Sequence, residues 1–206
     1  MATKEIVKRT KYEHSVQDRS LFRYYTGLIA RWIINLRFEY ARRLARNHGA
    51  EIGDGVIMPI KLAKIANSNL KIGDHSCVMT IQLDLRAPIH IGKHVIIGHS
   101  TKILTNSHDI NSTEFELKEC GLKINDYAWL PAKILILPSC REIGYGCVVS
   151  SGSCVTKNTN PMTVVGGNPA KEFKKRECIH SDFVVESLQG GDYKIYKDTW
   201  NKRNKQ

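Results

Sequence analysis

The chain has 206 residues, a length that suits one sizeable domain with appendages. No run of apolar residues reaches the length of a transmembrane helix, and the polar residues 1–18 predict no secretory signal, so we expect a cytoplasmic protein. The formal net charge of +11 indicates anionic partners, but no groove-entering or base-stacking motif supports nucleic acid, and we expect none.

Residues 1–50 are expected to form a polar arm followed by a basic amphipathic helix. Between residues 20 and 46 the apolar residues recur at helical spacing, six arginines lie among the other positions, and Asn47, His48 and Gly49 end the pattern. The apolar stripe comprises Leu21, Tyr25, Leu28, Ile29, Trp32, Ile33, Leu36, Tyr40 and Leu44. We expect this helix to pack against the central domain or a neighbouring subunit. The alternative is that residues 20–46 lie on an anionic bilayer, at the inner face of the cytoplasmic membrane.

A repeat of six residues runs through residues 51–170. Branched apolar residues recur at Ile91, Ile97 and Ile103, at Ile124, Leu130 and Ile136, and at Ile143, Val149 and Val155. A helix would need a period near 3.6 and a simple strand a period of two. Each hexad is too short to bury its own apolar side chain, but hexads stacked as the flat sides of a parallel coil bury them in one column. We therefore predict an all-β fold, a parallel β-helix over residues 51–170.

The repeat is interrupted in several places. It is irregular around residues 63–70 and 78–89, and a polar stretch at residues 109–121 reads as a loop that leaves one corner of the coil. Such insertions often lie on the binding face. Residues 171–206 form a basic, irregular extension that we expect to cap the end of the coil. The six cysteines follow no disulfide or zinc spacing, and Cys140 and Cys147 read as small apolar fillers of the coil, which suits a reducing compartment.

These hexads, together with the segment Val-Val-Gly-Gly-Asn-Pro-Ala-Lys at residues 164–171, resemble the hexapeptide-repeat acyltransferases, and in particular their branch of sugar and glycan O-acetyltransferases. The resemblance covers residues 52–176. It implies a left-handed coil and a homotrimer with each site in the cleft between neighbouring coils. It also implies acetyl-coenzyme A as the acyl donor, no metal, and a saccharide acceptor. The basic helix favours a surface glycan or its precursor.

His108 is the candidate catalytic base. It lies just ahead of the inserted loop, in the segment Asn106-Ser107-His108-Asp109, and an imidazole can take a proton from an alcohol near neutral pH. Members of the resembled family carry their general base at this point. The adjacent Asp109 could orient the ring or select its tautomer.

The expected donor site follows from the same resemblance. Ala132, after Trp129, matches the residue whose amide faces the thioester and would stabilise the oxyanion, although Pro131 replaces the glycine of the family. The pantetheine groove and the phosphate site are expected at Trp129, Ser151, Thr156, Lys157, Lys171, Lys174 and Lys175.

Asp84 and Arg86 precede His108 in an irregular part of the coil, and with Asn106 they are candidates for binding the hydroxyls of the acceptor. We therefore predict an acetyl-coenzyme A-dependent O-acetyltransferase that acts on a sugar hydroxyl by direct transfer. Three alternatives remain: an N-acetyltransferase of an amino sugar nucleotide, an antibiotic acetyltransferase and a non-catalytic repeat scaffold. A related zinc-dependent carbonic anhydrase needs three histidines at a spacing that this chain does not reproduce, so we expect no metal.

Overall fold

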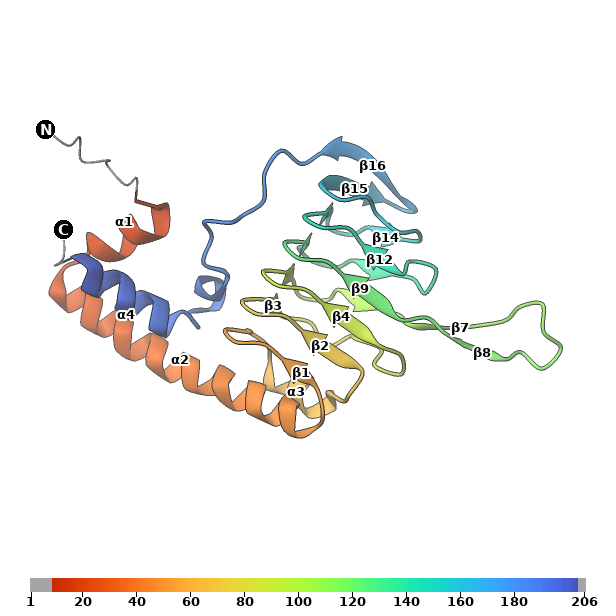
Figure 1. Ribbon diagram of the computed structural model, residues 1–206, viewed down its shortest axis with the longest axis horizontal. Coiled ribbons are helices and arrows are strands. Elements are labelled where there is room, and N and C mark those ends of the chain that lie inside the picture. The colour runs from red at the N-terminus through yellow and green to blue at the C-terminus, as the bar shows by residue number, and fades with distance from the viewer. Residues whose placement is uncertain (1–8, 204–206) are drawn as a thin grey trace, which may run out of the picture.

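A computed structural model describes residues 9–203 of the chain (Figure 1). Short parallel strands are stacked into a coil, a lobe of helices lies at the N-terminal end of the coil, and one hairpin projects from its side. Residues 1–8, the first part of the predicted polar arm, lie outside the described residues.

The coil has three flat sides, and the short strands of successive turns pair into one sheet on each side. Sheet A contains β1 (Glu51–Ile52), β2 (Leu70–Ile72), β4 (Ile89–Ile91), β9 (Leu122–Ile124) and β12 (Glu142–Ile143). Sheet B contains β3 (Cys77–Val78), β5 (Ile96–Ile97), β10 (Trp129–Leu130), β13 (Val148–Val149), β15 (Thr163–Gly167) and the antiparallel β16 (Ala170–Lys175). Sheet C contains β6 (Lys102–Ile103), β11 (Leu135–Ile136) and β14 (Cys154–Val155).

The hexads stack in register, as the repeat predicts. In sheet C, Ile136 lies between Ile103 and Val155, and in sheet B, Leu130 pairs with Ile97. All of these side chains are buried in one core cluster that runs along the coil. Burial of each is worth about 1.5–3 kcal/mol relative to exposure, so the column is the main stabilising feature of the coil. The parallel β-helix is therefore confirmed, and its left hand stays a prediction.

Cysteines fill small positions of the same column. Cys140 and Cys147 are buried, and burial raises the pKa of the Cys140 thiol to about 11. A thiol that stays protonated at neutral pH is a poor nucleophile and packs as a small apolar group, as the repeat predicts.

Tight corners join the three sheets, and left-handed residues stack at two of them. At the corner between sheets A and B these residues are His75, His94, Tyr127, Gly146 and Met162, and between sheets B and C they are Ser100, Lys133 and Gly152. The turns approach one another so closely that a Cβ atom at Gly98 would lie 1.3 Å from the carbonyl oxygen of Pro131. Only glycine fits there.

Two insertions account for the irregular stretches of the sequence. A short helix, α3 (Ile60–Ile65), leaves the first turn of the coil. At the corner between sheets C and A, β7 (Asn106–His108) and β8 (Leu117–Glu119) form an antiparallel hairpin that projects far from the coil (Figure 1). The predicted loop 109–121 is thus an ordered hairpin, whose first strand carries His108.

The ends of the chain are more helical than the sequence analysis predicts. The expected polar arm contains α1 (Lys11–Gln17), which begins with a capping box between Thr10 and Glu13, and α2 (Leu21–Asn47) follows it. The expected irregular extension contains η1 (Val185–Gln189) and α4 (Tyr193–Lys202). Asp192 joins these helices, because its buried carboxylate accepts hydrogen bonds from the Tyr12 hydroxyl at 2.6 Å and from Arg31 Nε at 3.0 Å.

Residues 176–186, which we term the strap, do not cap the end of the coil as expected. After β16 the chain runs back along the coil toward the helical lobe (Figure 1). The Arg176 guanidinium donates to the carbonyl oxygens of Tyr127 and Gly146 at 3.0 and 2.8 Å, and His180 Nε2 donates to the His94 carbonyl at 2.8 Å. The strap therefore covers the corner between sheets A and B, and it leaves sheet C and both of its edges uncovered.

Helix α2 has two opposite apolar faces. Its buried residues, Tyr24, Phe38, Ala41, Arg42 and Ala45, face the coil and the other helices. The predicted stripe lies on the other side and is largely exposed, so α2 packs against the coil, as predicted, but through residues outside the stripe. No helix within residues 9–203 has the length and hydropathy needed to cross a bilayer.

Candidate active site

His108 ends strand β7, and its ring is exposed at the base of the hairpin. Its Nδ1 lies 2.7 Å from the carbonyl oxygen of Phe115, and the two rings are stacked with centroids 4.2 Å apart. A carbonyl oxygen can only accept, so Nδ1 carries the proton, and in the neutral ring Nε2 is the nitrogen with the lone pair. Phe115 adopts a left-handed φ of 52°, which lets its carbonyl turn back toward the histidine. The hairpin thus holds His108 in the tautomer of a general base.

Asp109 has a different partner from the one expected. Its carboxylate pairs with Lys118 Nζ at 2.7 Å and accepts a hydrogen bond from the backbone N–H of Asn111 at 3.0 Å. The Lys118 ammonium holds the pKa of Asp109 below its usual range. Neighbouring residues of an extended strand point in opposite directions, which separates Asp109 from the imidazole of His108. The orienting role expected of Asp109 is therefore filled by Phe115.

Asp84 is the centre of a polar network beside β7. Its carboxylate forms a two-pronged ion pair with Arg86, at 2.8 Å to Nε and 2.9 Å to Nη2. It also accepts from the Asn106 amide at 3.1 Å, and its backbone carbonyl accepts from the Thr105 hydroxyl at 2.7 Å. The Arg86 guanidinium holds the pKa of Asp84 well below its usual range. The structure thus brings together the three predicted acceptor-binding residues. One of them, Asn106, precedes His108 by two residues on β7.

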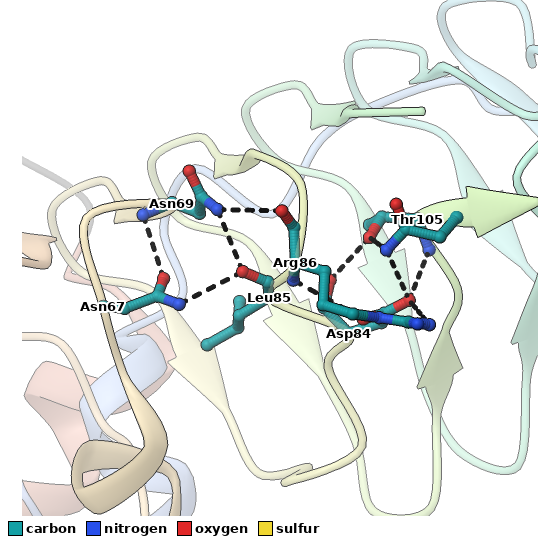
Figure 2. Close-up of polar contacts among 7 residues, drawn as sticks. Asn67, Asn69, Asp84, Leu85, Arg86 and Thr105 are labelled. Atoms are coloured by element: carbon teal, nitrogen blue, oxygen red, sulfur yellow. Dashed lines mark hydrogen bonds and ion pairs between the residues drawn. The ribbon is translucent and has the colours of Figure 1, made fainter. Parts of the chain in front are cut away.

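Two asparagines that the sequence analysis did not select position this network. Figure 2 shows Asn67 and Asn69 side by side, both directed at the backbone of the turn that carries Asp84 and Arg86. Their amides donate to the Leu85 carbonyl at 3.1 and 3.0 Å, and Asn69 also reaches the Arg86 carbonyl at 3.2 Å. The Asn-x-Asn spacing just before a regular hexad was the only sequence signal for this role.

Asn106 retains an unused acceptor. Its amide nitrogen donates to Asp84, whereas its side-chain oxygen is buried and has no hydrogen-bond partner within residues 9–203. A buried unpaired acceptor costs about 1–3 kcal/mol.

Residues predicted for the donor lie mainly at the corner between sheets B and C. Trp129 is exposed on β10, and Ala132 and Ser151 follow at equivalent places in successive turns. The carbonyl of Ala132 accepts from Gly152, but no acceptor in the described part of the chain takes its N–H. The amide that the resemblance assigns to the oxyanion is therefore available, even though Pro131 precedes it.

The remaining donor residues form two further groups. Thr156 and Lys157 follow β14 at the same corner as His108, where the Thr156 carbonyl accepts from the Ser139 hydroxyl at 2.7 Å. Lys171 and Lys174 are exposed on β16 with no ion pair to any described residue. Lys175 differs, because Glu172 pairs with it at 2.7 Å.

A single chain does not bring His108 and Ala132 together. The hairpin leaves the coil after β6, where sheet C meets sheet A, whereas Ala132 precedes β11, where sheet B meets sheet C. The candidate base and the candidate oxyanion donor thus lie at opposite edges of sheet C. Nowhere in residues 9–203 do three His, Cys, Asp or Glu side chains gather as metal ligands.

A coil of stacked hexads with an oriented histidine at one corner is the arrangement that the resemblance to the hexapeptide-repeat acyltransferases implies. No protein-family model matches the chain. It is 29% identical over 146 residues, 70% of this chain and 80% of the relative, to WcaF of Escherichia coli (strain K12), which is provisionally named a colanic acid biosynthesis acetyltransferase. It is also 29% identical to the galactoside O-acetyltransferase of Lactococcus lactis subsp. lactis (strain IL1403), over 70% of this chain and 71% of that protein.

Its fold matches the hexapeptide-repeat acetyltransferase VCA0836 of Vibrio cholerae with a TM-score of 0.60 and 22% identity, over 82% of this chain and all of that one. VCA0836 has also been solved with acetyl-coenzyme A. The chain is thus similar in sequence to named acetyltransferases and in fold to a hexapeptide-repeat acetyltransferase. The predicted family and the predicted enzyme class are thereby confirmed.

Proposed function

We propose that this chain transfers an acetyl group from acetyl-coenzyme A to a hydroxyl group of a saccharide, with His108 as general base. The observation that carries the proposal is the hydrogen bond from His108 Nδ1 to the Phe115 carbonyl, because it leaves Nε2 free to accept a proton. Sugar O-acetylation is also the activity in the name of the Lactococcus lactis relative.

The reaction needs two proton transfers, one from the sugar hydroxyl to His108 and one from His108 to the departing sulfur. His108 Nε2 takes the proton of the sugar hydroxyl as the oxygen bonds to the thioester carbon. The Ala132 N–H donates to the thioester oxygen while negative charge develops there. When the carbon–sulfur bond breaks, His108 returns its proton to the departing sulfur, so the products are an acetyl ester and free coenzyme A. General-base catalysis by one residue typically supplies about 10²–10⁴ in rate.

Several features of this chain suit the binding of acetyl-coenzyme A, the acyl donor. The unengaged Ala132 amide and the exposed side chains of Trp129 and Ser151 line one corner of the coil. Lys171 and Lys174 supply ammonium groups for the phosphates, whereas Lys175 is already paired with Glu172. We also assign Thr156 and Lys157, which follow β14 at the corner between sheets C and A, to the binding of acetyl-coenzyme A.

The separation of His108 and Ala132 supports a site shared between copies. We propose a homotrimer in which coils pack side by side, so that one edge of sheet C meets the opposite corner of the next coil. The strap leaves these surfaces uncovered. The incomplete site of a single chain favours this assembly.

We place the acceptor against the Asp84 network. Asp84 and Arg86 offer acceptors and donors for hydroxyl groups, and the hydrogen bond from Asn106 links their network to the strand that carries His108. The name of WcaF points to an exopolysaccharide, and on that basis we propose a surface glycan or its precursor as the substrate class. In such a site Asp109 acts indirectly, by fixing the hairpin through Lys118.

A screen of acceptors tests the proposal. Release of free thiol from acetyl-coenzyme A is measured with neutral saccharides, with amino sugar nucleotides and with chloramphenicol. We expect turnover with a neutral saccharide and an alkali-labile ester in the product. Turnover with an amino sugar alone, giving an alkali-stable amide, would replace O-transfer by N-transfer. Absence of both turnover and coenzyme A binding would favour a scaffold.

A further inference from the structure

Helix α2 exposes a long apolar face that the proposed chemistry does not use. We call this face the outer stripe; it consists of Leu21, Phe22, Tyr25, Ile29, Trp32, Ile33, Leu36 and Tyr40, whose exposed fractions range from 49% to 79%. These residues recur at helical spacing over about 30 Å of helix. Monomeric soluble proteins rarely leave so large a continuous apolar surface in water, so the outer stripe indicates a binding surface.

The outer stripe faces away from the coil. On the opposite side of α2, Ala41 and Ala45 join the core cluster of the coil, and Phe38 packs with Ile57. Figure 1 shows the C-terminal end of α2 beside β1 and α3, while the rest of the helix extends away from the coil toward α1 and α4. Coils packed side by side would therefore leave the outer stripe uncovered and would present it at the same end of every copy. The inference that the outer stripe stays uncovered in the assembly rests on the homotrimer of the proposed function.

The charge on α2 favours an anionic occupant over a second copy. The helix contains six arginines and a single acidic residue, Glu39. Arg23 and Arg37 are exposed and have no ion pair with any described residue, and Arg37 lies one helical turn after Ile33 on the flank of the outer stripe. Glu39 is held by Arg42 and Arg43, which lower the pKa of its carboxyl group. Two such faces would repel each other, whereas an anionic surface attracts both.

The residue types of the outer stripe suit the boundary between lipid and water. Tyr25, Trp32 and Tyr40 have an apolar ring with a polar edge, and such rings concentrate at the headgroup level of bilayers. Leucine and isoleucine fill the positions between them, and arginines flank them, which is the pattern of a helix that lies in the plane of a membrane surface. A protein partner would not require arginines at the margins.

We propose that the outer stripe binds the surface of an anionic membrane, with α2 lying parallel to the bilayer and the coil standing away from it. In this position the apolar side chains enter the boundary between headgroups and acyl chains. Arg23 and Arg37 contact lipid phosphates from the sides of the helix. The strands that carry His108 and the donor residues remain in water.

Vesicle flotation of the full-length protein tests this inference without any measurement of activity. Vesicles of phosphatidylcholine with phosphatidylglycerol are compared with vesicles of phosphatidylcholine alone. We expect the protein to float with the anionic vesicles, to float far less with the neutral ones, and to dissociate as ionic strength rises. Trp32→Glu should reduce flotation at least about tenfold, because a charge replaces an anchoring ring. Ile110→Glu, at an exposed apolar residue of the hairpin, is the matched control and should float normally.

A second pair of variants separates charge from apolar burial. Arg37→Glu should weaken flotation with anionic vesicles, whereas Lys123→Glu, an equivalent change on sheet A, should not. If Trp32→Glu fails to fold by circular dichroism, quenching of tryptophan fluorescence by brominated lipids in the unmodified protein replaces it, and quenching is expected. No flotation with either vesicle, or full flotation of Trp32→Glu, would overturn the inference. A fall in assembly mass on light scattering for folded Trp32→Glu would instead identify the outer stripe as a contact between copies.

Discussion

His108 and Phe115 are joined twice at the base of the hairpin. The histidine donates from Nδ1 to the phenylalanine carbonyl at 2.7 Å, and the two rings stack almost in parallel, 6° apart. The first contact selects the tautomer and the second fixes the plane of the ring. Together they define where Nε2 points, although neither residue is held by a carboxylate.

Removal of the stacking partner should misorient the base without affecting the donor. For Phe115→Ala we expect kcat to fall about tenfold or more, because small displacements of a catalytic group are costly. The KM for acetyl-coenzyme A should not change, and Phe115→Tyr, which keeps the ring, should retain most activity. Steady-state kinetics with both substrates varied provides the measurement. Equal activity of the Ala and Tyr variants would contradict a positioning role.

The Asp84 network should control the acceptor. Asp84→Asn removes the ion pair with Arg86 and weakens the polarisation of Asn106, so we expect the KM for the saccharide to rise about tenfold while coenzyme A affinity stays unchanged. Isothermal titration with coenzyme A and initial rates with the saccharide check the two parts. A lower melting temperature with an unchanged saccharide KM would show that Asp84 serves only structure.

A β16 lysine that forms no ion pair should contribute more to binding the phosphates of coenzyme A than one that is paired with a carboxylate. Lys171→Ala combined with Lys174→Ala should raise the KM for acetyl-coenzyme A about tenfold or more, because both ammonium groups lack an ion pair with the described residues. Lys175→Ala should have a smaller effect, since Glu172 already neutralises Lys175. Acetyl-pantetheine lacks the nucleotide, so the native protein, the double variant and Lys175→Ala should all use it equally well. A uniform loss with both donors would contradict phosphate binding.

The strap should loosen in mild acid. His180 Nδ1 accepts from the Arg176 guanidinium at 2.9 Å while Nε2 donates to the His94 carbonyl, so the ring is neutral in the folded protein. Burial lowers the pKa of His180 and of His94 below 6.5. The folded chain then binds fewer protons than the unfolded chain, and stability is lost as the pH falls through and below 6.5.

Hydrogen exchange measured on the two sides of this pH provides the check. Amides of residues 176–186 should exchange faster at the lower pH after correction for intrinsic rates, while those of sheet C should not. His94 also stacks on His75, which contacts the buried Glu186, so these two residues adjoin the histidines of the strap. His180→Gln should remove much of the pH effect. An unchanged pH dependence in that variant would locate the cause elsewhere.

The coil was predictable from the sequence because each hexad meets the same environment as its neighbours. Ile97, Leu130 and Val149 occupy equivalent places in successive turns, so one short period encodes their burial. Helix α4 gives no such signal, since its buried Tyr196 and Trp200 pack on Tyr24 from a distant part of the chain. Non-periodic packing of this kind depends on the tertiary structure.

The candidate site was only partly predictable for a similar reason. The position of His108 before an insertion could be inferred, and so could the clustering of Asp84, Arg86 and Asn106. The partner of His108 could not, because it is a backbone carbonyl that depends on the left-handed conformation of Phe115. The outer stripe was visible as helical spacing, but only the structure reveals that both sides of α2 are apolar.

The most direct test of the account is thiol release by His108→Ala with acetyl-coenzyme A and a saccharide acceptor that the native protein uses. We expect kcat to fall by about 10²–10⁴ while calorimetry shows unchanged coenzyme A binding. A variant that binds coenzyme A and keeps most of its turnover would contradict the assignment of His108 as the general base.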